Sequence, residues 1–277
     1  MKPERPSRTA HLVALGRAFA DAGLSHVADF SDPTARAFLS ERGQRSFDRI
    51  QGAAPKGKRL AVARSMADMA ALRTAAIDRA VRDAIAGGAT QLVILGAGYD
   101  GRAWRLPELA GVNVFEVDRA VTQRDKRARI AKLPAAVGLV NFVAIDFEHE
   151  SLATVLDRAG HDSSSPTCWL WEGVTMYLTR EAMHSTLADI ARRSARGSTL
   201  IVNYHTGRRG VFARLMFRLI GEPQISAWTR EEMAADLGAV GFAVHEDSGM
   251  MDWNERFAQR KANVGRAAYM RLATARL

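Results

Sequence analysis

The sequence predicts an α/β protein built around a parallel, doubly wound sheet. Five short and almost wholly apolar runs are typical of strands covered on both faces, and stretches with helical spacing of apolar residues separate them. Strands that alternate with helices in this way favour a parallel sheet between two helical layers. A chain of 277 residues is long enough for one large α/β domain, or two small ones, with a substantial core.

The expected elements begin with helices. Apolar residues at helical spacing predict helices over 9–22 and 34–50, on either side of a polar turn at residues 31–33. A long helix over 59–86 follows, which Gly87-Gly88 ends. The five strands are expected at residues 91–95, 112–117, 140–145, 167–171 and 199–203. Helices are expected between the later strands at residues 121–133, 148–159 and 180–194.

Two segments lie outside this α/β pattern. We expect residues 1–58 to form a helical N-terminal cap on a main domain of residues 59–277. We also expect a lid inserted at about 206–228, where an irregular basic and apolar segment follows the fifth strand. Thr229 can then cap a helix over 230–237. Two final strands are expected at residues 241–244 and 267–273.

Composition excludes several classes of protein. Hydrophobic residues make up 47% of the chain and charged residues 25%, as in a water-soluble globular protein, so intrinsic disorder is excluded. Cys168 is the single cysteine, which excludes an intrachain disulfide and a cysteine-based zinc site. The histidines show no metal-ligand spacing. Without a signal-like N-terminus or an apolar run near ~20 residues, we expect a cytoplasmic protein that does not span a membrane.

The net charge of +9 raises the question of a nucleic-acid partner, because neutralising phosphates releases counterions. The arginines are scattered along the chain, however, and the densest groups also suit solvated helix faces. These groups are Arg124–Arg129, Arg192–Arg196 and Arg208–Arg218. The sequence also offers no aromatic platform on which bases could stack. We therefore expect no nucleic-acid partner.

A glycine-rich loop follows the first expected strand. The run from Gly96 to Gly101 matches G-x-G-x-x-G, a pattern that allows a tight turn and a close approach of a nucleotide to the backbone. The pattern alone does not say which nucleotide. Pro107 follows six residues after Gly101, which leaves little helix to direct its N-terminus at a pyrophosphate. A cofactor without phosphates, such as S-adenosylmethionine, needs no such helix, so this spacing favours it over NAD.

Acidic residues follow three successive strands. Asp118 ends the second strand, twenty residues beyond Gly98, and suits a ribose diol, because a carboxylate can accept from both hydroxyls. It could also be the N-cap of the next helix. Asp146 ends the third strand and Glu172 follows the fourth. Since the carboxyl ends of parallel strands meet at one edge, where ligands bind, the three acids together predict a ligand site there.

These motifs together resemble a known family. The chain carries Arg73-Thr74 with Asp78, Leu95-Gly-Ala-Gly-Tyr-Asp-Gly-Arg102, Phe115-Glu-Val-Asp118, Asp146-Phe147 and Glu172-Gly-Val-Thr-Met-Tyr-Leu178. In this order they resemble the leucine carboxyl methyltransferase family, whose bacterial branch includes polyketide O-methyltransferases. The likeness covers roughly residues 7 to 245. Gly101 stands where the family usually has Thr, and Phe147 where it usually has Leu.

The resemblance implies a fold, a cofactor and roles for single residues. It implies a Rossmann-like class I methyltransferase sheet, whose last two strands pair antiparallel, and S-adenosylmethionine as the methyl donor. Arg73 would hold the methionyl carboxylate, Glu172 would face the ammonium group, and Gly96 and Gly98 would lie along the methionyl portion. Asp118 would take the ribose hydroxyls. Asp146 would accept from the adenine amino group, and Phe147 would bind the base.

The acceptor is expected to be a small molecule that is methylated on a carboxylate or hydroxyl oxygen. Tyr204 and His205 end the fifth strand and are candidates to orient the substrate, with His205 as a general base near neutral pH. Arg208 and Arg209, followed by the apolar stripe 211–220, favour an anionic and partly apolar acceptor. This stripe and Trp228 could line its pocket, or simply pack against the sheet.

Other functions stay open on the sequence. An NAD(P)-dependent oxidoreductase would share the fold and the glycine loop, although no Tyr-x-x-x-Lys or comparable hydride-transfer set is visible. A methyltransferase that acts on protein or nucleic acid is a further alternative. The sequence does not indicate an oligomeric state.

Overall fold

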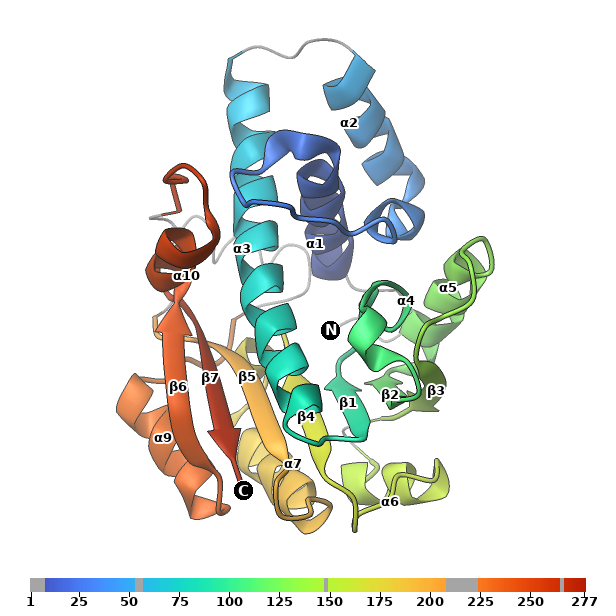
Figure 1. Cartoon of the computed structure of the whole chain (residues 1–277), viewed down its shortest axis with the longest axis vertical. Coiled ribbons are helices and arrows are strands. Elements are labelled where there is room, and N and C mark those ends of the chain that lie inside the picture. The colour runs from blue at the N-terminus through green and yellow to red at the C-terminus, as the bar shows by residue number, and fades with distance from the viewer. Residues whose placement is uncertain (1–7, 53–56, 147–148, 208–223, 265–266) are drawn as a thin grey trace.

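The computed structural model describes residues 8–52, 57–146, 149–207, 224–264 and 267–277, and its centre is a seven-stranded sheet in the order β3-β2-β1-β4-β5-β7-β6 (Figure 1). The strands are β1 Gln91–Leu95, β2 Asn113–Asp118, β3 Leu139–Ala144, β4 Thr167–Trp171, β5 Thr199–His205, β6 Ala243–Gly249 and β7 Met270–Arg276. Strands β1 to β5 are parallel, and β7 is antiparallel to both β5 and β6. The predicted doubly wound sheet with an antiparallel final pair is confirmed.

Helices cover both faces of the sheet (Figure 1). One face packs against α3 (Lys58–Ala86), α4 (Arg102–Arg105) and α10 (Met250–Phe257) around a core that includes Leu72, Leu92 and Trp253. The opposite face packs against α6 (Leu152–Arg158), α7 (Arg180–Arg192) and α9 (Arg230–Ala239). Helix α5 (Ala120–Ile130) connects β2 to β3. The sequence did not predict α4 or α10, and α6 is shorter than predicted.

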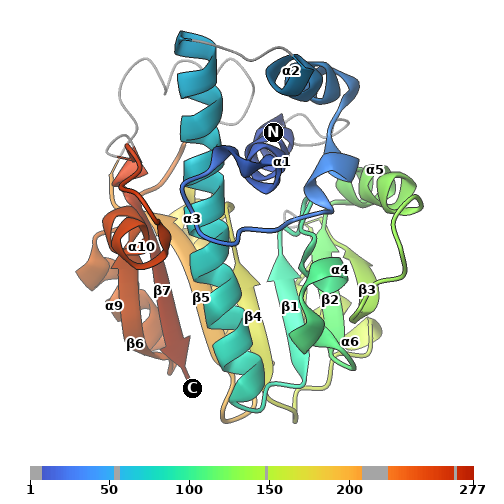
Figure 2. The same cartoon turned by 45° about the horizontal axis from the view of Figure 1, so that its top comes forward.

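The N-terminal helices form a cap with a core of its own. Helix α1 (Arg8–Phe19), a π-helical turn (Ala20–Leu24), a 3-10 turn (Ala35–Phe38) and α2 (Glu41–Gly52) gather beside the first half of α3, as Figure 2 shows. The prediction of one continuous helix over 34–50 is wrong. Leu39 is extended (φ −69°, ψ 135°), and Ser40 Oγ then accepts from Gly43 N at 3.2 Å, so α2 begins anew after this break.

The described residues contain neither a candidate membrane span nor a candidate metal cluster. No described helix combines the length and the apolar character that crossing a bilayer requires. Within the same residues, no three His, Cys, Asp or Glu side chains are grouped so that they could hold a metal ion.

Candidate cofactor site at the carboxyl edge of the sheet

The glycine loop lies against the ends of β2 and β4. Gly96 N and Ala97 N both donate to Val117 O, at 2.8 and 3.1 Å, which fixes the loop to the end of β2. Gly96 has φ +65°, and a Cβ on it would come closer than 3 Å to Val174, just beyond β4. Gly98 has φ +48°. Both residues therefore sit in the left-handed region that favours glycine, and Gly96 also has no space for a side chain.

Asp118 is bound to the glycine loop rather than standing apart from it. Its Oδ2 accepts from Gly98 N at 2.6 Å, and its Oδ1 accepts from Arg119 N at 2.6 Å. Burial raises the pKa of this carboxyl, and the two backbone donors and the nearby cations act in the opposite direction. The structure thus brings Asp118 together with Gly98, as the interpretation of a cofactor site requires.

Arg73 and Glu172 form an ion pair at the same edge. Arg73 Nε lies 2.9 Å from Glu172 Oε1, with the two side chains 12% and 17% exposed. Arg102 Nη1 donates to the other oxygen, Oε2, at 3.0 Å. Burial alone would raise the pKa of Glu172, but the two guanidinium groups outweigh it and hold the pKa below its ordinary value. Glu172 is therefore a carboxylate at neutral pH.

A buried network of charges continues behind this pair. Arg102 also contacts Asp78 at 2.7 Å and Asp100, and Arg105 contacts Asp78 at 2.6 Å. Arg102 holds the pKa of Asp100 at about 2, although burial acts to raise it. Sequence reasoning missed a role for these residues. Asp78, Asp100 and Arg102 belong to the quoted motifs, but the sequence does not say which charges pair.

The cap reaches the loop directly. Arg17 of α1 donates to Tyr99 O at 2.5 Å, and the Tyr99 ring stacks on Phe38 with centroids 5.5 Å apart. The Tyr99 hydroxyl donates to Asp125, and it lies 3.1 Å from His11 Nε2. The residue between the second glycine and Asp100 is therefore the one that anchors the loop in the cap, which the sequence alone did not indicate.

The predicted adenine-binding residues are only partly described. The Asp146 side chain is 59% exposed at the end of β3 and lies 2.9 Å from His149 Nδ1. Its backbone N donates to Glu150 Oε2 at 3.0 Å. Phe147 lies outside the described residues, as do Arg208, Arg209 and the stripe 211–220.

Tyr204 and His205 point to opposite faces of β5, because successive side chains alternate along a strand. Tyr204 belongs to the core on the α7 face, and its hydroxyl donates to Asp247 at 2.7 Å. Burial and Asp247 raise the pKa of this phenol. The expectation that Tyr204 joins His205 in the site is corrected, since Tyr204 is a packing residue. His205 is 1% exposed and meets Tyr269 edge to face, with centroids 4.8 Å apart.

Trp228, the other aromatic candidate, is also a core residue. It is 1% exposed, and its indole donates to Asp236 at 3.0 Å. Its backbone N donates to His205 O at 2.9 Å, so the chain after the expected lid returns to the end of β5. Of the two interpretations of Trp228, packing against the sheet is therefore the one that the structure supports.

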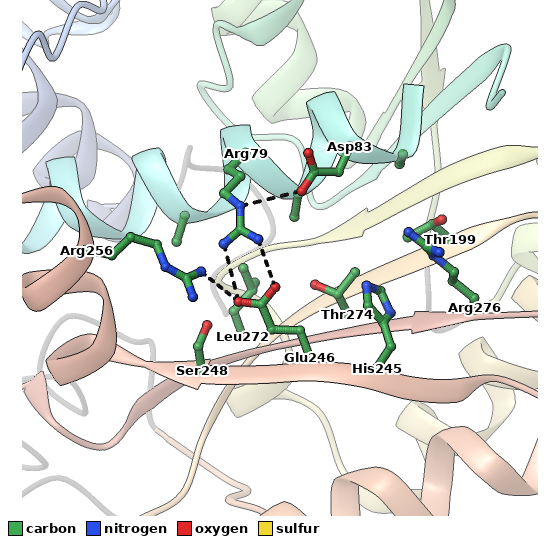
Figure 3. Close-up of a pocket in the computed structure, with 13 residues that line it drawn as sticks. Arg79, Asp83, Thr199, His245, Glu246, Ser248, Arg256, Leu272, Thr274 and Arg276 are labelled. Atoms are coloured by element: carbon green, nitrogen blue, oxygen red, sulfur yellow. Dashed lines mark hydrogen bonds and ion pairs between the residues drawn. The ribbon is translucent and has the colours of Figure 1, made fainter. Parts of the chain in front are cut away.

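A separate groove lies between α3 and the antiparallel strands (Figure 3). Arg79 and Arg256 both point at Glu246 within it, with shortest nitrogen–oxygen distances of 3.3 and 2.8 Å. Thr199, the first residue of β5, also lines it. The groove therefore lies away from His205 and the carboxyl edge, and its ion pairs connect α3 and α10 to the edge strand β6.

Comparison with known proteins identifies the family. A family model described as leucine carboxyl methyltransferase matches residues 10–191. A Streptomyces coelicolor protein described as an S-adenosyl-L-methionine-dependent methyltransferase is 34% identical over 205 residues, which cover 73% of this chain and 70% of the relative. The chain belongs to the leucine carboxyl methyltransferase family. A Mycolicibacterium smegmatis methyltransferase of the same description is 36% identical over 200 residues, covering 71% of this chain and 65% of the relative.

Solved structures support the fold of this methyltransferase. A DUF574-family protein from Streptomyces avermitilis matches with a TM-score of 0.62 at 14% identity, over 99% of this chain and 98% of that one. The structure of a Thermobifida fusca protein described as a methyltransferase matches with a TM-score of 0.58 at 16% identity, over 99% of this chain and 96% of that one. The protein is a class I, S-adenosylmethionine-dependent methyltransferase, as predicted.

The geometry fits this cofactor. Its amino-acid end carries one negative and one positive charge, and Arg73 and Glu172 offer one of each at 2.9 Å from one another. Beside them the glycine loop has no side chains at Gly96 and Gly98, and Asp118 supplies a half-buried carboxylate. Each feature is at the carboxyl edge, where ligands of such sheets bind.

Proposed function

We propose that this methyltransferase transfers the methyl group of S-adenosylmethionine to an oxygen of a small molecule, on a carboxylate or a hydroxyl. The observation that carries the proposal is membership of a family whose model is described as a carboxyl methyltransferase, over residues 10–191. The paired charges of Arg73 and Glu172 at the carboxyl edge agree with it.

The residues that would hold the cofactor are those the family motif names. Arg73 would bind the methionyl carboxylate through its guanidinium, and Glu172 would accept from the ammonium group. Asp118 would accept from the ribose hydroxyls while the loop at Gly96 and Gly98 lies along the methionyl portion. Asp146 and Phe147 would meet the adenine. S-adenosylmethionine supplies a methyl group that is activated by the attached sulfonium.

The protein's own part in the reaction would be to hold donor and acceptor in line and to exclude water. Well-oriented reactants can gain roughly 7–11 kcal/mol in this way. A carboxylate acceptor is already ionised at pH 7 and needs no base. A hydroxyl acceptor would lose its proton, and His205, at the end of β5, is the side chain we assign to accept it.

The acceptor class is proposed from charge and polarity. Arg208 and Arg209 would attract an anionic group, and the apolar stripe 211–220 would contact the rest of the molecule. Methylation of a carboxylate removes its charge, so the ester would bind more weakly and leave. An aromatic or polyketide-like acid meets both requirements. Hydroxyl methylation is the second candidate, and His205 favours it.

Radiolabelled methyl transfer tests the proposal. The protein is incubated with methyl-labelled S-adenosylmethionine and a panel of aromatic acids, phenols and their analogues, and products are separated and identified by mass. Label in a small molecule that mild alkali releases as methanol identifies a carboxyl ester, whereas alkali-stable label identifies an ether. Label found only in protein or nucleic acid would contradict the small-molecule assignment. Arg208→Ala/Arg209→Ala should raise KM for an acidic acceptor without changing the affinity for cofactor.

A further inference from the structure

Arg102 holds an unusual position at the site. It directly follows the glycine loop, its side chain is 2% exposed, and it contacts three carboxylates. These belong to Asp78, Asp100 and Glu172. A guanidinium can serve several carboxylates at once, because its donors project in a planar fork. Burying so many charges is costly unless each is paired, so the position of each partner is tightly determined.

The two oxygens of Glu172 are divided between two arginines. Oε2 faces Arg102 at 3.0 Å, and Oε1 faces Arg73 at 2.9 Å. Without Arg102, Arg73 could take both oxygens in the bidentate geometry that arginine and carboxylate prefer. Such a pair would be more difficult for a ligand to separate. Because Arg102 already donates to Oε2, it competes with Arg73 for that oxygen and works against a bidentate pair.

If Arg73 and Glu172 have the cofactor roles proposed above, the ion pair between them must open when the cofactor binds, and each residue must exchange its partner for one charged group of the cofactor. When the cofactor's amino-acid end binds, its carboxylate pairs with Arg73 and its ammonium group donates to Oε1 of Glu172. The internal pair has one charge of each sign, as has the amino-acid end, so the exchange leaves the local net charge unchanged. Oε1 can serve the ammonium only if the carboxylate does not rotate when Arg73 leaves it.

We propose that Arg102 is a positioning residue for cofactor binding, which holds Oε2 of Glu172 so that Oε1 stays directed at the cofactor's ammonium group. Arg102 does not itself meet the cofactor. Its effect is confined to the amino-acid end, because Asp118, the residue proposed above to bind the ribose, is held by Gly98 N and Arg119 N and not by Arg102. The affinity for a ligand that lacks the amino-acid end should therefore not depend on Arg102.

Arg102→Lys is the variant that tests this, with Arg105→Lys as its matched control. Lysine keeps the charge but is a single point that cannot span three carboxylates. Arg105 is similarly buried, at 5% exposed, and contacts Asp78 at 2.6 Å, but its ion pairs are with Asp78 and Asp32. Calorimetry measures the affinity of each protein for S-adenosylhomocysteine, which has the amino-acid end, and for 5′-methylthioadenosine, which lacks it.

The expected result is selective. Arg102→Lys should lower the affinity for S-adenosylhomocysteine by about tenfold or more, the scale of one lost charge-assisted hydrogen bond, and change that for 5′-methylthioadenosine by less than about threefold. Arg105→Lys should leave the ratio of the two affinities within about threefold of the parent. If Arg102→Lys weakens both ligands equally, or neither, the proposal is overturned. Failure of the unsubstituted protein to bind either ligand would instead contradict the cofactor site itself.

A second variant covers the case in which Arg102→Lys does not fold. The double variant Arg102→Gln/Asp100→Asn removes one charge of each sign and keeps the cluster neutral. Circular dichroism establishes that it is folded, and the same two affinities are then compared. A selective loss of S-adenosylhomocysteine binding supports the proposal, and an equal loss of both ligands overturns it.

Discussion

Gly96→Ala should damage the glycine loop in two separable ways. At φ +65° an alanine costs about 1–2 kcal/mol relative to glycine, because its Cβ meets the following carbonyl oxygen. That Cβ would also come closer than 3 Å to Val174 Cγ2. Relieving such an overlap by moving packed atoms costs about 1–3 kcal/mol. We therefore expect Gly96→Ala to lower the free energy of unfolding by about 2–5 kcal/mol, the sum of the two contributions.

Val174→Ala separates the two contributions. In the parent protein it removes two methyl groups from a half-buried side chain and should cost about 1 kcal/mol. In the Gly96→Ala background it removes the overlap, so the same substitution should stabilise the protein. The sign reverses as long as the overlap costs more than the about 1 kcal/mol that Val174→Ala costs in the parent protein. The assay is urea unfolding of the four proteins by linear extrapolation, with affinity for S-adenosylhomocysteine measured beside it.

The reasoning fails if Val174→Ala destabilises both backgrounds by the same amount, since the overlap would then not exist. The double variant should still be less stable than Val174→Ala alone by the backbone contribution of about 1–2 kcal/mol. Its cofactor affinity should stay below that of the parent, because the loop also carries the donor from Gly98 to Asp118.

Three further predictions concern Asp118, the pair of Lys126 and Glu116, and His161. Asp118→Ala should weaken S-adenosylhomocysteine binding by roughly 1–3 kcal/mol. It should also lower the free energy of unfolding by a comparable amount, because the Asp118 carboxylate accepts from Gly98 N and Arg119 N. Unchanged stability would contradict this. Lys126→Met should lower the free energy of unfolding in urea by about 3–5 kcal/mol, because it leaves the buried Glu116 without the Lys126 Nζ that lies 2.5 Å from its Oε2. The double variant Lys126→Met/Glu116→Leu should recover most of that loss, because it removes both charges. Burial and Arg193 lower the pKa of His161 to about 4, so the unfolded state binds more protons between pH 6.5 and about 4, and stability falls as the pH falls through that window. His161→Gln should flatten this part of the stability–pH profile, measured by urea unfolding at each pH, and a parallel profile would refute the assignment.

The parts of the fold that the sequence predicted well are those set by local burial. Strands β1 and β4 match their predicted bounds, because both are wholly buried and consist of continuous apolar runs. Strand β6 begins and ends later than predicted, since His245, Glu246 and Asp247 are unusual in a strand. Their charges are satisfied by distant side chains: Arg79 and Arg256 pair with Glu246, and Arg271 pairs with Asp247. Such partners cannot be found from local sequence.

In the candidate site, too, features set by local sequence were predicted and features set by packing were not. The sequence placed Asp118 and Glu172 at one edge of the sheet correctly, because Asp118 ends β2 and Glu172 follows β4. The carboxyl ends of parallel strands lie at the same edge. Tyr204 was misassigned although the strand period already separates it from His205, so that error could have been avoided. The partners of Arg102 could not be predicted, because they come from α3, the glycine loop and the end of β4, and only packing brings them together.

The cap also explains why Gly101 stands where the family usually has Thr. A Cβ at position 101 would come closer than 3 Å to Thr34 Oγ1, which belongs to the cap. That hydroxyl donates to Asp32 at 2.5 Å, and Asp32 in turn pairs with Arg17 at 3.0 Å. A threonine hydroxyl thus lies beside the loop, but it comes from the N-terminal segment and not from the loop itself. Since Arg17 also donates to Tyr99 O, the cap lies against the loop at two positions, Tyr99 and Gly101. The glycine loop is thus held from two sides, by the end of β2 at Gly96, Ala97 and Gly98 and by the cap at Tyr99.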